Sequence, residues 1–170
     1  MAAAGSPLVV NATELLRQPG SRRRVTSDVA PAAVGLDDPR VSGDIALDVT
    51  FESSLDDVVV TGLLRVVHHD ACRRCLREID DVLEVAVDER YRVDPTPVDD
   101  AFPIVNGQID LAAMVREEVL LAVPDAPLCR PDCPGLCPIC GADLAEGPCG
   151  CDSTERDERW AVLDQLRVDE

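Results

Sequence analysis

A cysteine-rich segment near the end of the chain constrains its structure more than any other feature. Six cysteines lie within the 23 residues 129–151, in the spacing C-x3-C-x3-C-x2-C-x8-C-x-C, and Cys72 and Cys75 form a CRRC motif far upstream. Cysteines two or three residues apart suit tetrahedral zinc, because a tight turn can direct both sulfurs at one ion. The glycines and prolines between them supply such turns. The sequence therefore predicts all eight cysteines as zinc ligands.

Two zinc ions account best for these ligands. A short loop closes at little entropic cost, which predicts one local site made of Cys137, Cys140, Cys149 and Cys151. The second site would then join distant segments through Cys72, Cys75, Cys129 and Cys133. The main alternative is a single ion held by Cys72, Cys75, Cys137 and Cys140. Four thiolates per ion leave no open coordination position, so the zinc is expected to be structural.

The same cysteines bear on the compartment in which the chain works. The N-terminal residues lack the basic start and apolar run of a signal peptide. No stretch reaches the roughly 18–20 apolar residues of a membrane span. We therefore expect a cytoplasmic protein whose cysteines stay reduced. A secreted scaffold with four disulfides is the less favoured alternative, because paired CxxC motifs are typical of metal sites.

The middle of the chain predicts an antiparallel sheet. Apolar and polar residues alternate over 45–52 and again over 83–93, as in strands with one buried face. Residues 58–68 are apolar on both faces, which predicts a central strand, and Gly62 is expected to mark a bulge in it. The CRRC motif lies between two of these strands. We therefore expect a long hairpin with a zinc knuckle at its tip.

A helix is predicted over residues 111–123, where apolar residues keep helical spacing. Asp110 is its expected N-cap, Pro124 ends it, and its apolar side should cover the sheet. Shorter elements are expected around these: a strand at 8–10, a brief helix near 14–18, a strand at 25–30, and loops at 31–44 and 94–108.

These elements predict an α+β fold, with an antiparallel sheet or hairpin core, one covering helix and a C-terminal zinc-binding cysteine module. We expect three parts: a body at 1–125 that carries the knuckle hairpin, a cysteine-rich module at 126–152 packed on the body, and a helix or tail at 153–170.

Charge limits the choice of partner. The net charge is -17, which opposes non-specific attraction to nucleic acid and favours basic proteins. Two groups of arginines depart from this acidity: the basic run at 22–24 and the pair at 73–74 in the first knuckle. Separately, Trp160 lies on a narrow apolar stripe of the last predicted helix. The possible RNA or partner contacts are Arg22, Arg23, Arg24, Arg73, Arg74 and Trp160. Alternatively, the basic run is a solvated loop, the knuckle arginines neutralise thiolates, and the tryptophan packs on the chain itself.

The sequence predicts no active site and no small-molecule substrate. Phosphate-binding glycine loops, nucleophile elbows and Ser/His/Asp arrangements are missing from it. A redox role for CxxC would need a thioredoxin-like context, whereas here the motif joins two strands. His68 and His69 adjoin the knuckle and could replace a cysteine, but a solvated pair at a strand end is favoured.

Three stretches together resemble a known family. Residues 58–91, with strand–CRRCL–strand, are followed by IDLAAMVREEVLLAVPDAPLC and by DCPGLCPICGADL…GPCGC. This ordered set resembles the YceD family of large-subunit ribosomal RNA accumulation proteins, in a cysteine-rich, actinobacterial-like form. The resemblance implies a cytoplasmic, non-enzymatic factor that promotes synthesis, processing or accumulation of 23S rRNA. Its implied partners are large-subunit rRNA, a large-subunit ribosomal protein or an assembly factor. The alternative is a zinc-stabilised protein-interaction adaptor that acts outside the ribosome.

Overall fold

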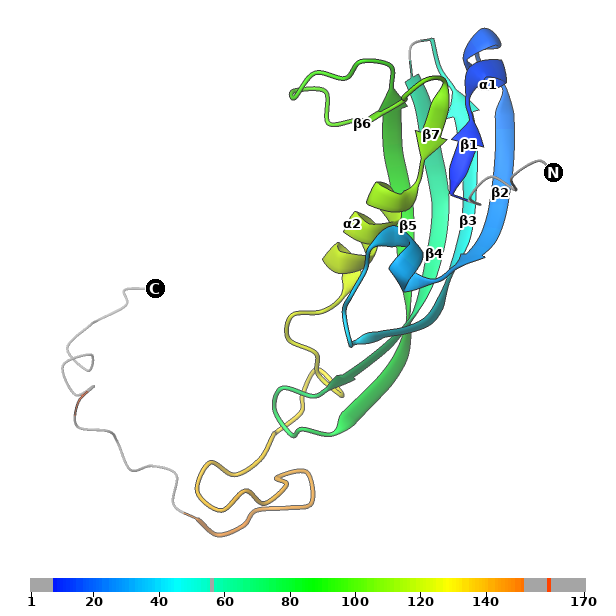
Figure 1. The fold of residues 1–170 in the computed structure, drawn as a ribbon. Helices are drawn as coiled ribbons and strands as arrows, with labels where there is room; N and C mark the ends of the chain where they lie inside the picture. Colours follow the sequence, from blue (N-terminus) through cyan, green and yellow to red (C-terminus); the bar gives the residue numbers. More distant parts are fainter. Residues whose placement is uncertain (1–7, 56, 152–158, 160–170) are drawn as a thin grey trace.

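The computed structural model describes residues 8–55, 57–151 and 159, and it has an α+β fold, as predicted (Figure 1). Its elements, in chain order, are β1 (Val9–Asn11), α1 (Thr13–Arg17), β2 (Arg22–Val29), the 3-10 helix η1 (Pro31–Val34), β3 (Val41–Ser53), β4 (Asp57–Ala71), β5 (Glu78–Arg92), β6 (Phe102–Pro103), β7 (Gln108–Asp110) and α2 (Ala112–Ala122). No helix within the described ranges is long and apolar enough to span a membrane.

The main sheet has five strands in the order β2-β3-β4-β5-β6. Strands β2 to β5 are antiparallel neighbours, and the short β6 runs parallel to β5. The β4–β5 hairpin is paired from Asp57 and Arg92 to Ala71 and Glu78, so the CRRC motif lies at its tip, as expected. Helix α2 and the separate β1–β7 sheet cover one face (Figure 1).

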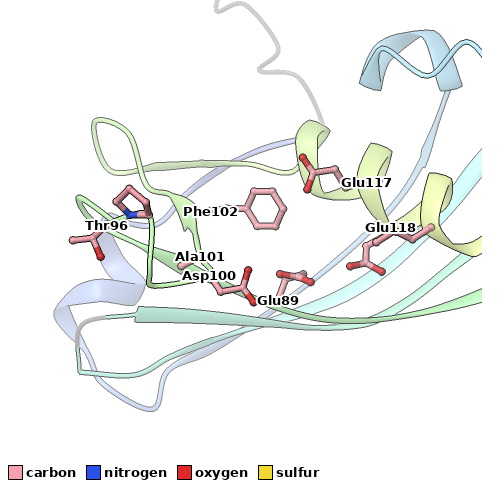
Figure 2. Close-up of a pocket in the computed structure, with 9 residues that line it drawn as sticks. Glu89, Thr96, Asp100, Ala101, Phe102, Glu117 and Glu118 are labelled. Carbon is pink, nitrogen blue, oxygen red and sulfur yellow. The ribbon is translucent and has the colours of Figure 1, made fainter.

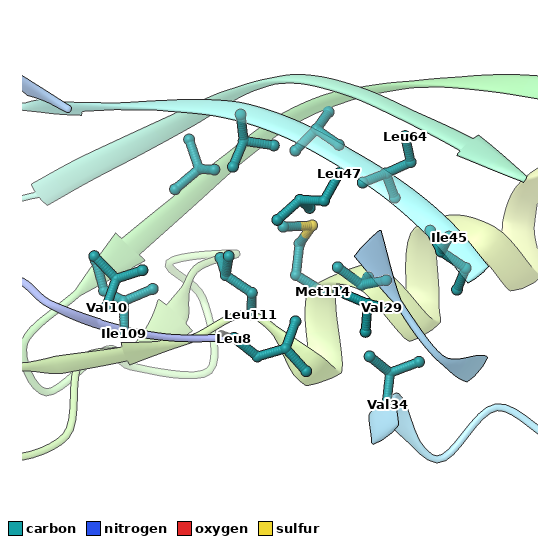
Figure 3. Packing of buried hydrophobic residues seen from close by; sticks show 14 of the residues in the cluster. Leu8, Val10, Val29, Val34, Ile45, Leu47, Leu64, Ile109, Leu111 and Met114 are labelled. Atoms are coloured by element: carbon teal, nitrogen blue, oxygen red, sulfur yellow. The ribbon is translucent and has the colours of Figure 1, made fainter. Parts of the chain in front are cut away.

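Aliphatic side chains fill the space between this face and its cover. Along β3, every second side chain from Ile45 to Phe51 is buried, which is the predicted period-two pattern. Met114 of α2 points into the centre of this cluster, between Leu47 and Leu111 (Figure 3). The predicted helix therefore does cover the apolar face of the sheet.

Strand β4 differs from its prediction in two ways. It is central, but it buries only one face: Val66 is fully buried while its neighbour Val67 is 36% exposed. Gly62 marks no bulge, because it pairs regularly with Val49 and Val87. A Cβ atom at Gly62 would lie 2.2 Å from the carbonyl oxygen of Asp48. The glycine is thus explained by the close approach of the β3 backbone.

The irregularity in this sheet lies in β3 instead, where the register shifts between Ser42 and Ala46. Strand β3 begins at Val41, earlier than predicted, since the residues before the alternating run still pair with β4. Strand β2 likewise begins at Arg22, earlier than the predicted strand at 25–30, so the alternative that the basic run is a solvated loop is wrong.

Two helix starts use side chains placed two residues before the first helical residue. Asp110 Oδ1 accepts a hydrogen bond from Ala112 N at 2.9 Å, and Asn11 Oδ1 accepts one from Thr13 N at 2.9 Å. The predicted loop at 94–108 contains β6, whose Phe102 stacks on buried Tyr91 with ring centroids 5.2 Å apart. This contact ties the segment to β5.

Candidate metal centres

The eight cysteines gather in two groups of four, and each group could hold one metal ion. The first group joins the β4–β5 hairpin tip to the segment after α2, and its members are Cys72, Cys75, Cys129 and Cys133. All four sulfurs lie within 4.8 Å of one another. The Cys72–Cys133 and Cys75–Cys129 sulfur pairs are 3.8 Å and 3.6 Å apart. A tetrahedron with metal–sulfur bonds of about 2.3 Å has sulfurs about 3.8 Å apart, so the spacing fits one ion.

The second group lies wholly within the cysteine-rich segment and consists of Cys137, Cys140, Cys149 and Cys151. Its sulfurs also lie within 4.8 Å of one another. Cys140 and Cys149 are exposed, whereas Cys72 and Cys133 of the first group are buried. The grouping is the one expected from sequence spacing. The alternative single site would have to mix sulfurs that the structure places in different groups.

Both CxxC motifs form the same turn. Leu76 N donates to Cys72 O at 2.8 Å, and Gly141 N donates to Cys137 O at 2.9 Å. Leu76 and Gly141 both have left-handed backbones, with φ of 59° and 73°. This turn directs both sulfurs of a motif to one side. Glycine adopts the left-handed conformation without cost, but leucine does not.

This comparison predicts opposite effects for exchanges at the two turns. Gly141→Ala should destabilise the metal-loaded protein by about 1–2 kcal/mol through backbone strain, because no atom lies within 4 Å of the added Cβ. Leu76→Gly should stabilise it by up to about 1 kcal/mol, since glycine relieves strain but loses more chain entropy. Denaturant unfolding with metal bound measures both. Destabilisation by Leu76→Gly would contradict the assignment of strain.

Backbone contacts attach the cysteine-rich segment to the hairpin tip. Arg73 N donates to Pro127 O at 2.9 Å, and Leu136 N donates to Arg74 O at 3.1 Å. The Arg74 guanidinium donates to Cys133 O at 2.9 Å. A Cβ at Gly135 would lie 3.0 Å from Arg74 O, so this contact requires a small residue. Arg74 therefore links the hairpin tip to the cysteine-rich segment beside the first cysteine group.

Backbone amides favour the thiolate form at one cysteine of each group. Hydrogen bonds from backbone groups, led by Cys129, lower the pKa of the Cys72 thiol to about 6. Backbone groups of Cys140 and Ile139 lower the pKa of Cys137 to about 6 in the same way. Thiolate is the form that binds metal. By contrast, burial raises the pKa of Cys129 to about 12, and hydrogen bonds with Cys140 and Cys149 raise the pKa of Cys151 to about 12. The backbone amides therefore prepare one sulfur of each group for a cation.

The two histidines do not form the predicted solvated pair. His69 is exposed and lies within hydrogen-bond distance of Asp80 and Ser42. His68 points to the covered face of β4 and is buried, with its Nε2 3.7 Å from Asp70 Oδ2. They face opposite sides of the sheet because neighbouring strand residues alternate. Neither histidine belongs to a cysteine group.

The arginines proposed as contacts lie in different surroundings. Arg22 and Arg24 pair across the strands with Glu52 at 2.9 Å and Asp48 at 2.6 Å, and Arg23 is exposed. Arg73 is exposed on the first knuckle, whereas Arg74 makes the structural contact described above. The last predicted helix, with Trp160, lies outside the described residues. The exposed pairs neutralise much of the basic run.

Comparison with known proteins identifies the family. The family described as "Large ribosomal RNA subunit accumulation protein YceD" matches residues 60–167, which include all eight cysteines. The chain belongs to the YceD family. The family match covers most of β4 and all of β5 and α2, the elements that position the first cysteine group.

Relatives of this YceD chain occur in mycobacteria. An uncharacterised protein of Mycobacterium tuberculosis is 34% identical over 170 aligned positions, covering 95% of this chain and 82% of that protein. One of Mycobacterium leprae is 33% identical, covering 95% and 78%. The chloroplastic "Large ribosomal RNA subunit accumulation protein YCED homolog 1" of Arabidopsis thaliana is 33% identical over 66 residues, covering 39% of this chain and 21% of that protein. No solved structure is a significant match.

Proposed function

We propose that this YceD chain is a cytoplasmic, non-enzymatic factor that promotes the accumulation of 23S rRNA during assembly of the large ribosomal subunit. Family membership carries the proposal, because the family and its Arabidopsis member are both named for large-subunit rRNA accumulation. The two all-cysteine groups support a structural role for metal, since four thiolates would leave no position for a substrate.

We assign zinc to both cysteine groups. In the first group, sulfur spacings of 3.8 Å and 3.6 Å suit zinc's tetrahedral coordination. In the second group, all four sulfurs lie within 4.8 Å of one another, which a single ion can also bridge. The first ion would fix the hairpin tip against the segment after α2, and the second would fold the cysteine-rich segment itself. Zinc would thus hold a surface in shape for a partner and would take no part in chemistry.

The partner is either large-subunit rRNA or a protein of the assembling subunit. An RNA contact would use the exposed Arg23 and Arg73, with Arg22 and Arg24 released from their carboxylates. A protein contact agrees better with the net charge of -17, which repels phosphate at long range.

Depletion of the protein in its host tests this function. We expect free large subunits and 23S rRNA to fall severalfold relative to small subunits and 16S rRNA, because the factor acts on one subunit only. Sucrose-gradient profiles and rRNA quantification measure the change. Wild-type protein should restore the ratio and Cys72→Ser should not. An unchanged subunit ratio would refute the ribosomal role and favour an adaptor acting elsewhere.

A further inference from the structure

A carboxylate occupies the core-facing row of β5. Val85, Val87 and Tyr91 in this row are buried, and Glu89 lies half-buried between the last two. Its partner across the strands is the fully buried Val60. An ionisable group in such a row costs stability unless it finds a partner. The period-two alternation of residues 83–93 already places Glu89 in this row, and folding alone does not explain a carboxylate there.

Glu89 faces a hollow of about 410 Å³ between β5, β6 and α2 (Figure 2). Asp100, Glu117 and Glu118 also line it, and no lining residue among those described is basic. Burial, a hydrogen bond with Glu118 and repulsion by Glu118 and Asp100 raise the pKa of Glu89 to about 7. The hollow therefore concentrates negative charge in a partly dehydrated place.

Several carboxylates of the sheet have cationic partners within the chain. Asp48 pairs with Arg24, Glu84 with Arg65, and Asp57 with Arg92. Among the ion pairs of the described residues, none includes a carboxylate of the hollow; these are Glu89, Asp100, Glu117 and Glu118. The charge of these four carboxylates is therefore not balanced by an ion pair within the described residues.

Apolar surface continues from this hollow across Phe102. A second hollow of about 380 Å³ lies there. It is lined by the apolar Val9, Phe102, Pro103, Val105 and Ala113 and by the polar Asn106, Gln108 and Asp110. Beside the acidic hollow, Leu121 of α2 is 83% exposed. Phe102 lines both hollows, so they lie side by side and together offer a surface with a mainly apolar half and an acidic half.

We propose that this surface, the Phe102 groove, docks a basic segment of a partner protein, with an apolar side chain beside Val105 and arginine or lysine side chains beside Glu89. Charge complementarity selects this occupant, because four carboxylates with no cationic partner among the described residues repel nucleic-acid phosphate and attract cations. Proteins that assemble on rRNA carry such basic segments to neutralise phosphate. The ribosomal setting rests on the proposed function, but the binding chemistry does not.

Fluorescence anisotropy with the zinc-loaded full chain tests the docking. The probe is a labelled twelve-residue peptide with one leucine followed by arginines at alternate positions. At pH 8, above the raised Glu89 pKa of about 7, both carboxyls are mostly ionised. The double variant Glu89→Gln/Glu118→Gln should then bind the probe about tenfold more weakly, because two charges facing the arginines are lost. Its thermal stability should not fall, since the substitutions also remove mutual repulsion. Replacing the probe's leucine with serine should weaken binding as well.

The matched control is Glu52→Gln/Glu84→Gln, which removes the same charge from exposed carboxylates on the uncovered face of the sheet. It should bind the peptide within about twofold of wild type, since distant surface charges are screened by salt. The proposal would be overturned if both double variants lost peptide affinity equally, or if neither lost any. The proposal would also be overturned if an rRNA hairpin competed with the peptide and bound the Glu89→Gln/Glu118→Gln variant more weakly than wild type. That result would mean that the groove binds RNA. Normal subunit ratios after depletion would refute the ribosomal function without affecting this measurement.

Discussion

Replacing Cys72 with serine should release one of two zinc ions and destabilise the protein by more than about 4 kcal/mol, because loss of a structural metal is among the most damaging single changes. Cys72 is fully buried and its sulfur lies 3.8 Å from that of Cys133, 61 residues along the chain. Without the ion, three buried or half-buried thiols remain, and the hairpin tip loses its attachment to the segment after α2. Metal analysis and denaturant unfolding measure the two effects.

Cys149→Ser provides the matched control. Cys149 is exposed and belongs to the second group, whose members all lie between residues 137 and 151. The variant should also lose one zinc ion, but the body should keep most of its stability, since no body strand contributes to that group. Two retained ions after Cys72→Ser, or equal destabilisation by both substitutions, would contradict the assignment of a long-range first centre.

The second large effect is expected at Phe51, which is fully buried on β3. Phe51→Ala should lower the free energy of unfolding by about 3–5 kcal/mol, through lost burial and the cavity left behind. Both zinc ions should remain bound in the folded variant, because Phe51 pairs with Val60 in the body and not with the knuckle. Denaturant unfolding measures the loss of stability in the body, and metal content after purification shows whether both zinc ions remain bound.

Val82→Ala is the control for this substitution. Val82 is 51% exposed on the uncovered face of β5, so the change should cost less than about 0.5 kcal/mol. A comparable loss in both variants would mean that the uncovered face of the sheet is buried in solution. Loss of zinc in Phe51→Ala alone would mean that the body and the first centre unfold together.

Features encoded over short distances could be predicted from the sequence. The alternation in β3 predicted its buried row, and the apolar spacing of α2 predicted a covering helix. Repeated CxxC spacings predicted the two groups of sulfurs that the structure brings together. Each of these patterns depends on the backbone period or on a turn of a few residues, which the local sequence specifies directly.

Features that depend on which surfaces meet could not be predicted in this way. Gly62 looked like a bulge because its neighbouring backbone was unknown, and His68 looked solvated because its cover was unknown. Glu89 lies in a regular strand, and only the packing of α2 and β6 surrounds it with other carboxylates. Periodicity fixes which side chains share a face of a strand, but the distant segments that cover that face decide which of them are buried. The cysteine spacing alone thus predicted the two groups of four sulfurs, whereas tertiary packing decided which carboxylates gather in the hollow beside Glu89.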